Sequence, residues 1–149
     1  MKVYHPATFA DGVYVANNLR NEDKNEVEGF GMDPFFIPFS LLMSEHPTVF
    51  TDYKGNKAGV AGIVREDGDI GCIWMLCTPA VLDMPIAFFR QSKQWLDEVQ
   101  GDYKMLWNLA DVRNHYHHKL LRFLGFKAIN TVPTGPNNLP YYEIVRLCV

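Results

Sequence analysis

The sequence predicts a single α/β (α+β) domain, residues 1–149, in which a mixed sheet of six to seven strands carries helices on both faces. Three observations lead to this prediction. The length of 149 residues fits one domain, and a hydrophobic fraction of 48% supplies its core. Residues 70–78 are apolar almost throughout, which is typical of a central strand covered on both faces. The helix-like and strand-like segments do not alternate as they would in a doubly wound sheet.

The N-terminal part is predicted to hold a strand at residues 1–7 and a helix at residues 9–19. Thr8 is a suitable N-cap for this helix. The charged residues 21–28 either continue the helix or form a second one, which ends at Gly29.

A Phe-rich segment follows, and its residues 39–43 are predicted to be a short apolar helix. Residues 35–39 have two interpretations, core beneath the sheet or an interface for a partner, and rare exposed apolar patches favour the core. The remaining strands are predicted at residues 48–53, 58–65, 70–78, 104–110, 127–132 and 141–149.

Two helices are predicted between the later strands. Pro85 suits the first position of one of them, with Asp83 as its N-cap, and Gly101 ends it. The last helix begins near Asp111 or Asn114, and apolar residues at helical spacing give it a buried face. Gly125 is predicted to end this helix in a left-handed conformation, with Phe126 packing back as in a Schellman motif.

Composition excludes several classes of function. A net charge of −3 gives no support for binding to nucleic acid or to an anionic membrane, and no apolar run is long enough to span a bilayer. Three cysteines without a C-x-x-C pair, and no apolar leader, predict reduced thiols and a cytoplasmic protein.

The order of elements, together with two local motifs, resembles the GNAT N-acetyltransferase superfamily over nearly the whole chain. Asn114 and Gly125-Phe126 stand where that family has Asn and Gly-Phe. Leu121 replaces the Tyr that often serves as general acid, and His117 replaces a small residue.

The segment that corresponds to the family's phosphate-binding loop differs more strongly from the family pattern. Within residues 82–87, only Ala87 fits the family pattern. Leu82 replaces Arg or Gln, and Pro85 replaces a glycine whose N–H would face the pyrophosphate. Asp83 adds a negative charge at the same place, so the loop is a poor phosphate cradle.

The resemblance implies acetyl-CoA as cofactor and names its contacts. The backbone of Met75, Leu76 and Cys77 would pair with the pantetheine arm, and Ala87 would lie near the phosphates. Asn114 would contact the cofactor; alternatively, it only caps its helix.

The catalytic residues are not marked by the sequence. Glu45 and His46 are candidate general bases, and Asp52 and Glu66 have no better context. Cys77 as a nucleophile is disfavoured by its apolar strand. No metal site is predicted, because the histidines at 115, 117 and 118 spread around the helix.

Two functions from different classes therefore stay open. The first is an acyl-CoA-dependent N-acyltransferase acting on an unknown small or protein amine. The second is a catalytically inactive GNAT-like protein that binds a protein partner. Residues 18–28, 73–78, 106–108 and 124–126 also resemble GNAT-like proteins of tailed bacteriophages, which implies a virion component or host-interaction factor, in the host cytoplasm or the virion.

Overall fold

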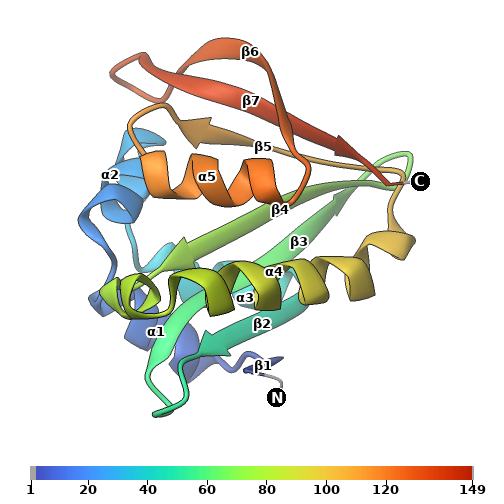
Figure 1. The fold of residues 1–149 in the computed structure, drawn as a ribbon. Coiled ribbons are helices and arrows are strands. Elements are labelled where there is room, and N and C mark those ends of the chain that lie inside the picture. Colours follow the sequence, from blue (N-terminus) through green and yellow to red (C-terminus); the bar gives the residue numbers. More distant parts are fainter. Residues whose placement is uncertain (1–2, 149) are drawn as a thin grey trace.

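The computed structural model describes residues 3–148 and contains one mixed seven-stranded sheet (Figure 1). The strands are β1 (Tyr4–Pro6), β2 (Glu45–Thr51), β3 (Lys57–Glu66), β4 (Ile70–Cys77), β5 (Met105–Asp111), β6 (Lys127–Thr134) and β7 (Leu139–Leu147). Their order across the sheet is β1-β2-β3-β4-β5-β7-β6. Only β4 and β5 are parallel neighbours, whereas all other pairs are antiparallel. The predicted fold class is confirmed.

Helices cover both faces of the sheet. They are α1 (Phe9–Asn17), α2 (Asn21–Gly29), α3 (Phe36–Met43), α4 (Pro85–Val99) and α5 (His115–Phe123). In Figure 1, α4 and α5 lie in front of the sheet and α1 and α3 behind it. The larger core lies under α4 and α5 and includes Phe88, Trp95 and Leu120. A smaller core on the other face joins Val15, Ile37 and Leu41 to the sheet.

Helix α1 begins where its predicted N-cap, Thr8, places it. The Thr8 side chain accepts a hydrogen bond from the Asp11 amide, and the Asp11 carboxylate accepts one from the Thr8 amide. Met1 and Lys2, predicted within the first strand, lie outside the described residues. Arg20 has an extended backbone between α1 and α2, so residues 21–28 form a second helix and do not continue the first.

Helix α3 begins at Phe36, earlier than the predicted Phe39. The Asp33 side chain accepts a hydrogen bond from the Phe35 amide, and the Asp33 carbonyl accepts one from the Phe36 amide, which together start the first turn. The core interpretation of residues 35–39 is confirmed for Ile37 and Pro38, which are buried, and is wrong for Phe35, Phe36 and Phe39, which are all more than half exposed.

The ends of α4 and α5 test two further predictions. Asp83 is not an N-cap, because it ends a short 3₁₀ turn, Pro79–Asp83, and α4 starts without a side-chain cap. Pro85 at the first position of α4 is confirmed. The predicted end of α5 is also confirmed, with Gly125 at φ 88° and the Phe126 amide bonded to the Leu121 carbonyl at 2.9 Å. No helix within residues 3–148 is long and apolar enough to cross a membrane.

Candidate functional site

The candidate site lies where β4 and β5 diverge. The two strands pair only at their beginnings, where Ile70 lies opposite Met105 and Cys72 opposite Trp107. Beyond these pairs, the Asn108 side-chain amide donates to the Ile73 carbonyl at 2.7 Å across the opening gap. A cavity of about 330 Å³ occupies the space, and Met75 and Leu76 are among its lining residues. The divergence of the two backbones thus forms the gap, and the side chains around it determine its remaining volume.

A buried pair of charges fills the end of this gap. Arg20 and Asp23 are 5% and 1% exposed, and both oxygens of the Asp23 carboxylate accept hydrogen bonds from the Arg20 guanidinium, at 3.2 and 3.3 Å. The guanidinium also lies over the Tyr116 ring, 5.0 Å from its centroid. An ion pair that is this deeply buried keeps its place only with several additional hydrogen bonds.

Asn114 supplies some of these bonds from the start of α5. Its side-chain carbonyl accepts from Arg20 at 2.6 Å, and its amide donates to Asp23 at 2.8 Å and to Glu26 at 2.7 Å. Asn114 is at the N-cap position of α5 but makes no side-chain capping bond. The Asn114 side chain therefore joins α5 to α2 and does not cap α5.

Glu26 is held at the wall of the cavity by β5 and β7. Its carboxylate accepts a hydrogen bond from the Asp111 amide at 3.1 Å, and its backbone carbonyl accepts one from the Tyr141 hydroxyl at 2.6 Å. The hydroxyl reaches α2 only because residue 29 is glycine, since a Cβ there would collide with it. Burial raises the pKa of Glu26 above its ordinary value of 4.5.

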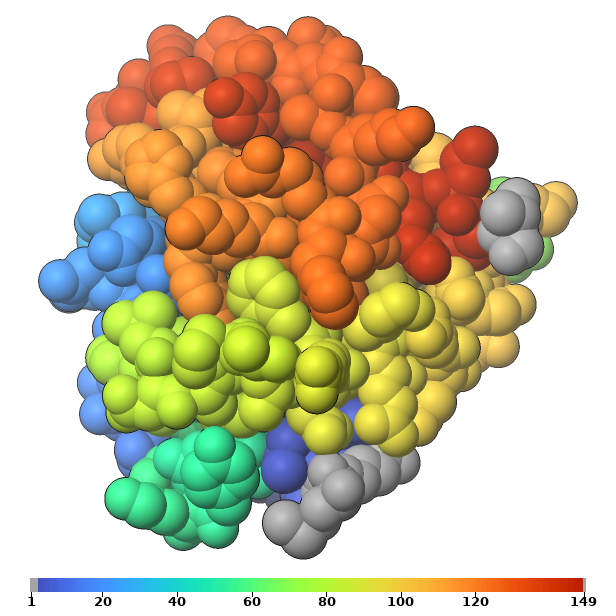
Figure 2. Space-filling model, viewed as in Figure 1, coloured from blue at the N-terminus to red at the C-terminus, as the bar shows by residue number. Residues whose placement is uncertain are grey.

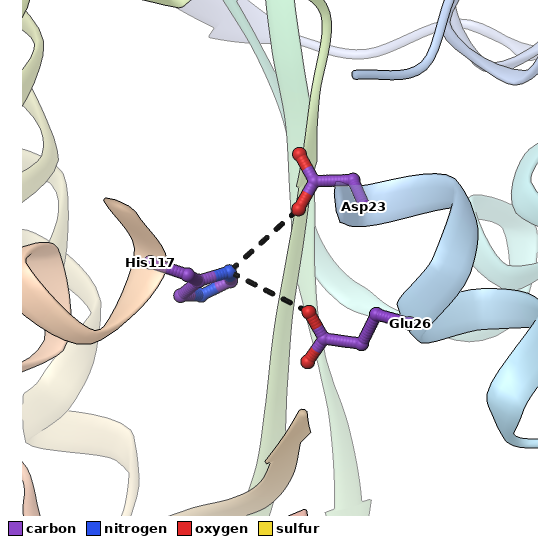
Figure 3. Close-up of side chains that lie close together, drawn as sticks. All are labelled: Asp23, Glu26 and His117. Atoms are coloured by element: carbon purple, nitrogen blue, oxygen red, sulfur yellow. Dashed lines mark ion pairs between the residues drawn. The ribbon is translucent and has the colours of Figure 1, made fainter. Parts of the chain in front are cut away.

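His117 points from α5 toward both carboxylates (Figure 3). Its Nδ1 lies 4.0 Å from Asp23 Oδ1 and 4.0 Å from Glu26 Oε2. Burial alone would lower the pKa of His117, but the two carboxylates outweigh it, so the pKa is raised above 6.5. For Asp23, burial is likewise outweighed, by His117 and Arg20, and its pKa is lowered. The two carboxylates thus favour the protonated form of His117.

Asp23, Glu26 and His117 are close enough to suggest a metal site, with ligand atoms within 4.8 Å of one another. The donors are already used, however. The Asn114 amide nitrogen bonds to both carboxylates and so lies between them, and Arg20 bonds to both oxygens of Asp23. A divalent ion would have to displace an amide and lie beside a guanidinium, so this cluster carries no metal assignment.

Arg20 and Asp23 also form hydrogen bonds with the backbone groups of Cys77 that face the gap. The Cys77 carbonyl accepts from the Arg20 amide at 2.9 Å, and the Cys77 amide donates to Asp23 Oδ2 at 3.0 Å. The resemblance to the GNAT family implies that these two backbone groups would pair with the pantetheine arm of acetyl-CoA. Burial raises the pKa of the Cys77 thiol well above its ordinary value, which leaves it a poor nucleophile.

Aromatic side chains close the surface between α4 and α5. Phe89 packs edge-on against Tyr116, with ring centroids 5.7 Å apart, and Phe123 lies 5.5 Å from Phe89. Figure 2 shows the atoms of α4, in yellow-green, directly against those of α5, in orange. A shallow groove remains outside these rings, lined by Leu82, Pro85, Ile86, Phe89, Arg90, Tyr116, Lys119 and Phe123.

The other predicted site residues lie in separate places. Ala87 lies half-buried on α4. Glu45 bonds to Arg65 at 3.0 Å and to the Tyr103 hydroxyl at 2.6 Å, which lowers the pKa of Glu45. His46 pairs with Asp102 at 2.8 Å. The structure does not bring these two candidate bases to the cavity, where Glu26 lies instead.

Sequence reasoning missed Arg20, Asp23 and Glu26. Their segment has the composition of a solvated helix, and their partners in α5 are about 90 residues away in sequence. A signal was nevertheless present, because residues 20, 23 and 27 recur at helical spacing and Val27 marks that face as buried.

The comparisons with known proteins concern the fold. No protein-family model and no curated protein matches the chain. Ard1 from Thermoplasma volcanium is similar in structure with a TM-score of 0.76 and 12% identity, over 98% of this chain and 97% of that one. A GNAT superfamily phosphinothricin acetyltransferase from Sinorhizobium meliloti, solved with acetyl-CoA, gives 0.71 and 17% identity over 97% and 87%.

A third similar structure is the ribosomal-protein-S5-alanine acetyltransferase from Vibrio fischeri, with a TM-score of 0.70 and 15% identity over 99% of this chain and 94% of that one. At such identities, structural likeness shows the fold and no more. These neighbours are GNAT superfamily acetyltransferases, and the chain has the GNAT acetyltransferase fold.

Proposed function

We propose that this chain is a GNAT-fold binding protein that does not transfer acyl groups from coenzyme A, and that its binding site is the cavity between β4 and β5. One observation carries the proposal. The amide and carbonyl of Cys77, where a pantetheine arm would pair, are bonded to Asp23 and Arg20 of the same chain.

Other features of the coenzyme path agree with this proposal. The Asn114 side chain is committed to α2, and Phe89 and Tyr116 meet where the arm would pass between the helices. Pro85 has no N–H to offer a phosphate, and Asp83 would repel one. Freeing Cys77 would break the bond from its amide to Asp23 and the bond from the Arg20 amide to its carbonyl, and each buried group left without a partner costs about 1–3 kcal/mol. The residues present therefore do not fit the coenzyme.

Calorimetric titration with acetyl-CoA and with CoA tests the proposal. We expect neither to bind at millimolar concentration. Micromolar affinity would contradict the proposal, most clearly if Asn114→Ala then weakened it. Release of free CoA from acetyl-CoA, in the presence of amines, gives an independent reading, and we expect none above the rate without protein.

An N-acyltransferase is the second candidate, and the cavity favours it. Met75 lines the cavity, and Glu26 lies in its wall with a raised pKa, as suits a general base that accepts the proton of an attacking ammonium. This function requires the Arg20–Asp23 pair to leave β4. If it does so, acetyl-CoA will bind, and Glu26→Gln will lower turnover more than affinity.

For the non-catalytic role, the sequence predicts a protein partner, and its likeness to phage proteins predicts a virion component or host-interaction factor. These assignments, like the cytoplasmic or virion location, stay predictions. Capture of a defined partner by the purified chain would support them.

A further inference from the structure

Helix α3 exposes an apolar face on the side away from the sheet. Every residue of α3 except Ser40 is apolar. Ile37 and Leu41 are buried and pack toward the sheet, whereas Phe36 and Phe39 on the other side are more than half exposed. A helix that is apolar all round is normally buried within a larger structure. We therefore expect another molecule to cover the exposed face of α3.

Helix α1 and the residue before α3 extend this face into one surface. Phe39 packs edge-on against Phe9 of α1, with ring centroids 5.3 Å apart. The two helices approach closely at Gly12, where a Cβ would lie 2.7 Å from the Pro38 Cα. Six apolar residues, each between 43% and 75% exposed, make up what we call the α3 surface: Phe9, Phe35, Phe36, Phe39, Leu42 and Met43.

The area of the α3 surface is large enough for a stable interface. A residue of this size has about 200 Å² of surface, so the exposed fractions of the six residues amount to about 700 Å². The largest apolar patch on a typical monomer measures about 300–600 Å². Two copies facing each other would bury about 1,400 Å², and stable protein interfaces bury about 1,200–2,000 Å² in total.

The charges around the α3 surface favour a second copy as its cover. Residues 34–44 carry no charged side chain, and Asp33 before them is acidic. Lys57, beside α1, is paired with Asp11 at 3.0 Å. An anionic membrane would require lysines or arginines next to the apolar face, and residues 33–44 contain none. Two antiparallel copies of α3, in contrast, bring apolar side chains together and keep the two Asp33 carboxylates at opposite ends.

We propose that the α3 surface pairs with the same surface of a second copy of this chain, with the two α3 helices antiparallel about a two-fold axis near Phe39. Phe39 then meets its own copy at the axis, and Phe36 lies across from Leu42. Phe36 and Met43 also line the cavity between β4 and β5, so the second copy borders that cavity. The inference does not depend on whether the chain binds coenzyme A.

Sedimentation equilibrium of the purified chain tests the proposal. We expect a monomer–dimer equilibrium with a dissociation constant of about 10 µM or below, since interfaces of this size give micromolar or tighter affinity. Phe39→Lys places two like charges at the axis and should weaken the dimer about 30-fold or more. Ile129→Lys is the control, because this residue is 60% exposed on β6, at the edge of the sheet opposite β1, and the change should leave the dissociation constant as it is.

A mixture of Phe39→Lys with Phe39→Glu tests the two-fold arrangement itself. Each variant alone should be monomeric, and the mixture should form a heterodimer because opposite charges then face each other at the axis. A general loss of structure would not give this recovery. A monomeric wild-type chain at millimolar concentration, equal effects of Phe39→Lys and Ile129→Lys, or no recovery in the mixture would overturn the proposal.

Leu42→Lys provides a second test if urea denaturation shows that Phe39→Lys does not fold. Leu42 is 69% exposed, and its change should weaken the dimer about tenfold. Pelleting with vesicles of phosphatidylcholine and phosphatidylserine tests the membrane as the alternative cover. We expect the chain to stay in solution, and vesicle binding that Phe39→Glu abolishes would overturn the proposal.

Discussion

The space between α4 and α5 and the cavity between β4 and β5 differ in what their side chains do. Between the two helices, Phe89 and Tyr116 pack against each other. Within the sheet, a cavity of about 330 Å³ is lined from both faces, and Asp23 of α2 bonds to the Cys77 amide. The same divergence of strands therefore comes with aromatic rings between the helices and a pocket inside the sheet, and the backbone fold alone does not assign an activity.

The largest effect that tests this comparison is expected from Asp23→Ala. The change leaves Arg20 without its one buried carboxylate partner and the Cys77 amide without its acceptor, which should cost about 3–5 kcal/mol in the free energy of unfolding. Urea denaturation measures this loss in the free energy of unfolding. Glu22→Ala is the control, because that residue pairs with Arg20 from an exposed position and should cost less than about 1 kcal/mol. Similar losses in the two variants would mean that the buried cluster does not hold α2 against β4.

A smaller loss of stability is expected from changes at the contact between α2 and β7. Gly29→Ala places a Cβ on the Tyr141 hydroxyl and should destabilise the protein by about 1–3 kcal/mol. Tyr141→Phe removes the hydroxyl and its bond to the Glu26 carbonyl, at about 1 kcal/mol. In a double-mutant cycle, Gly29→Ala should cost less when it is combined with Tyr141→Phe, and strict additivity would contradict the close packing.

The smallest expected effect is a pH dependence that arises from His117. Because its folded pKa lies above 6.5, His117 contributes stability that is fully present below pH 6.5 and is lost as pH rises through the folded pKa. The groups facing it are Asp23, Glu26 and Arg20. Urea denaturation at several pH values should show that His117→Gln flattens this slope. His115→Gln, exposed on the same helix, should leave the slope as it is, and a flattening there would contradict the assignment.

The fold was predictable from sequence because its signals are local. The Thr8 cap, Pro85 at the start of α4 and Gly125 at the end of α5 each act within a few residues, and the apolar β4 identifies the centre of the sheet. Helix α3 was placed too late because its first turn depends on the polar side chain of Asp33 and exposes its Phe residues.

The candidate site was less predictable because its bonds are long-range. Asn114 was identified because it matches an Asn of the GNAT family. Its partners Asp23 and Glu26 have no feature in the nearby sequence that distinguishes them from the exposed Glu22 and Glu28. The histidines at 115, 117 and 118 were expected to spread around their helix without a shared site. In the structure, His117 points toward the carboxylates of Asp23 and Glu26. Only the folded chain brings opposite charges together at this depth.

The most direct test of the closed coenzyme path is an NMR titration of the ¹⁵N-labelled protein with acetyl-CoA, which follows the backbone amide of Cys77. We expect its resonance to stay in place at millimolar acetyl-CoA, because the Asp23 carboxylate already accepts this hydrogen bond. A saturable shift of the Cys77 amide, together with that of Met75, would show that the coenzyme reaches β4, and it would contradict the account.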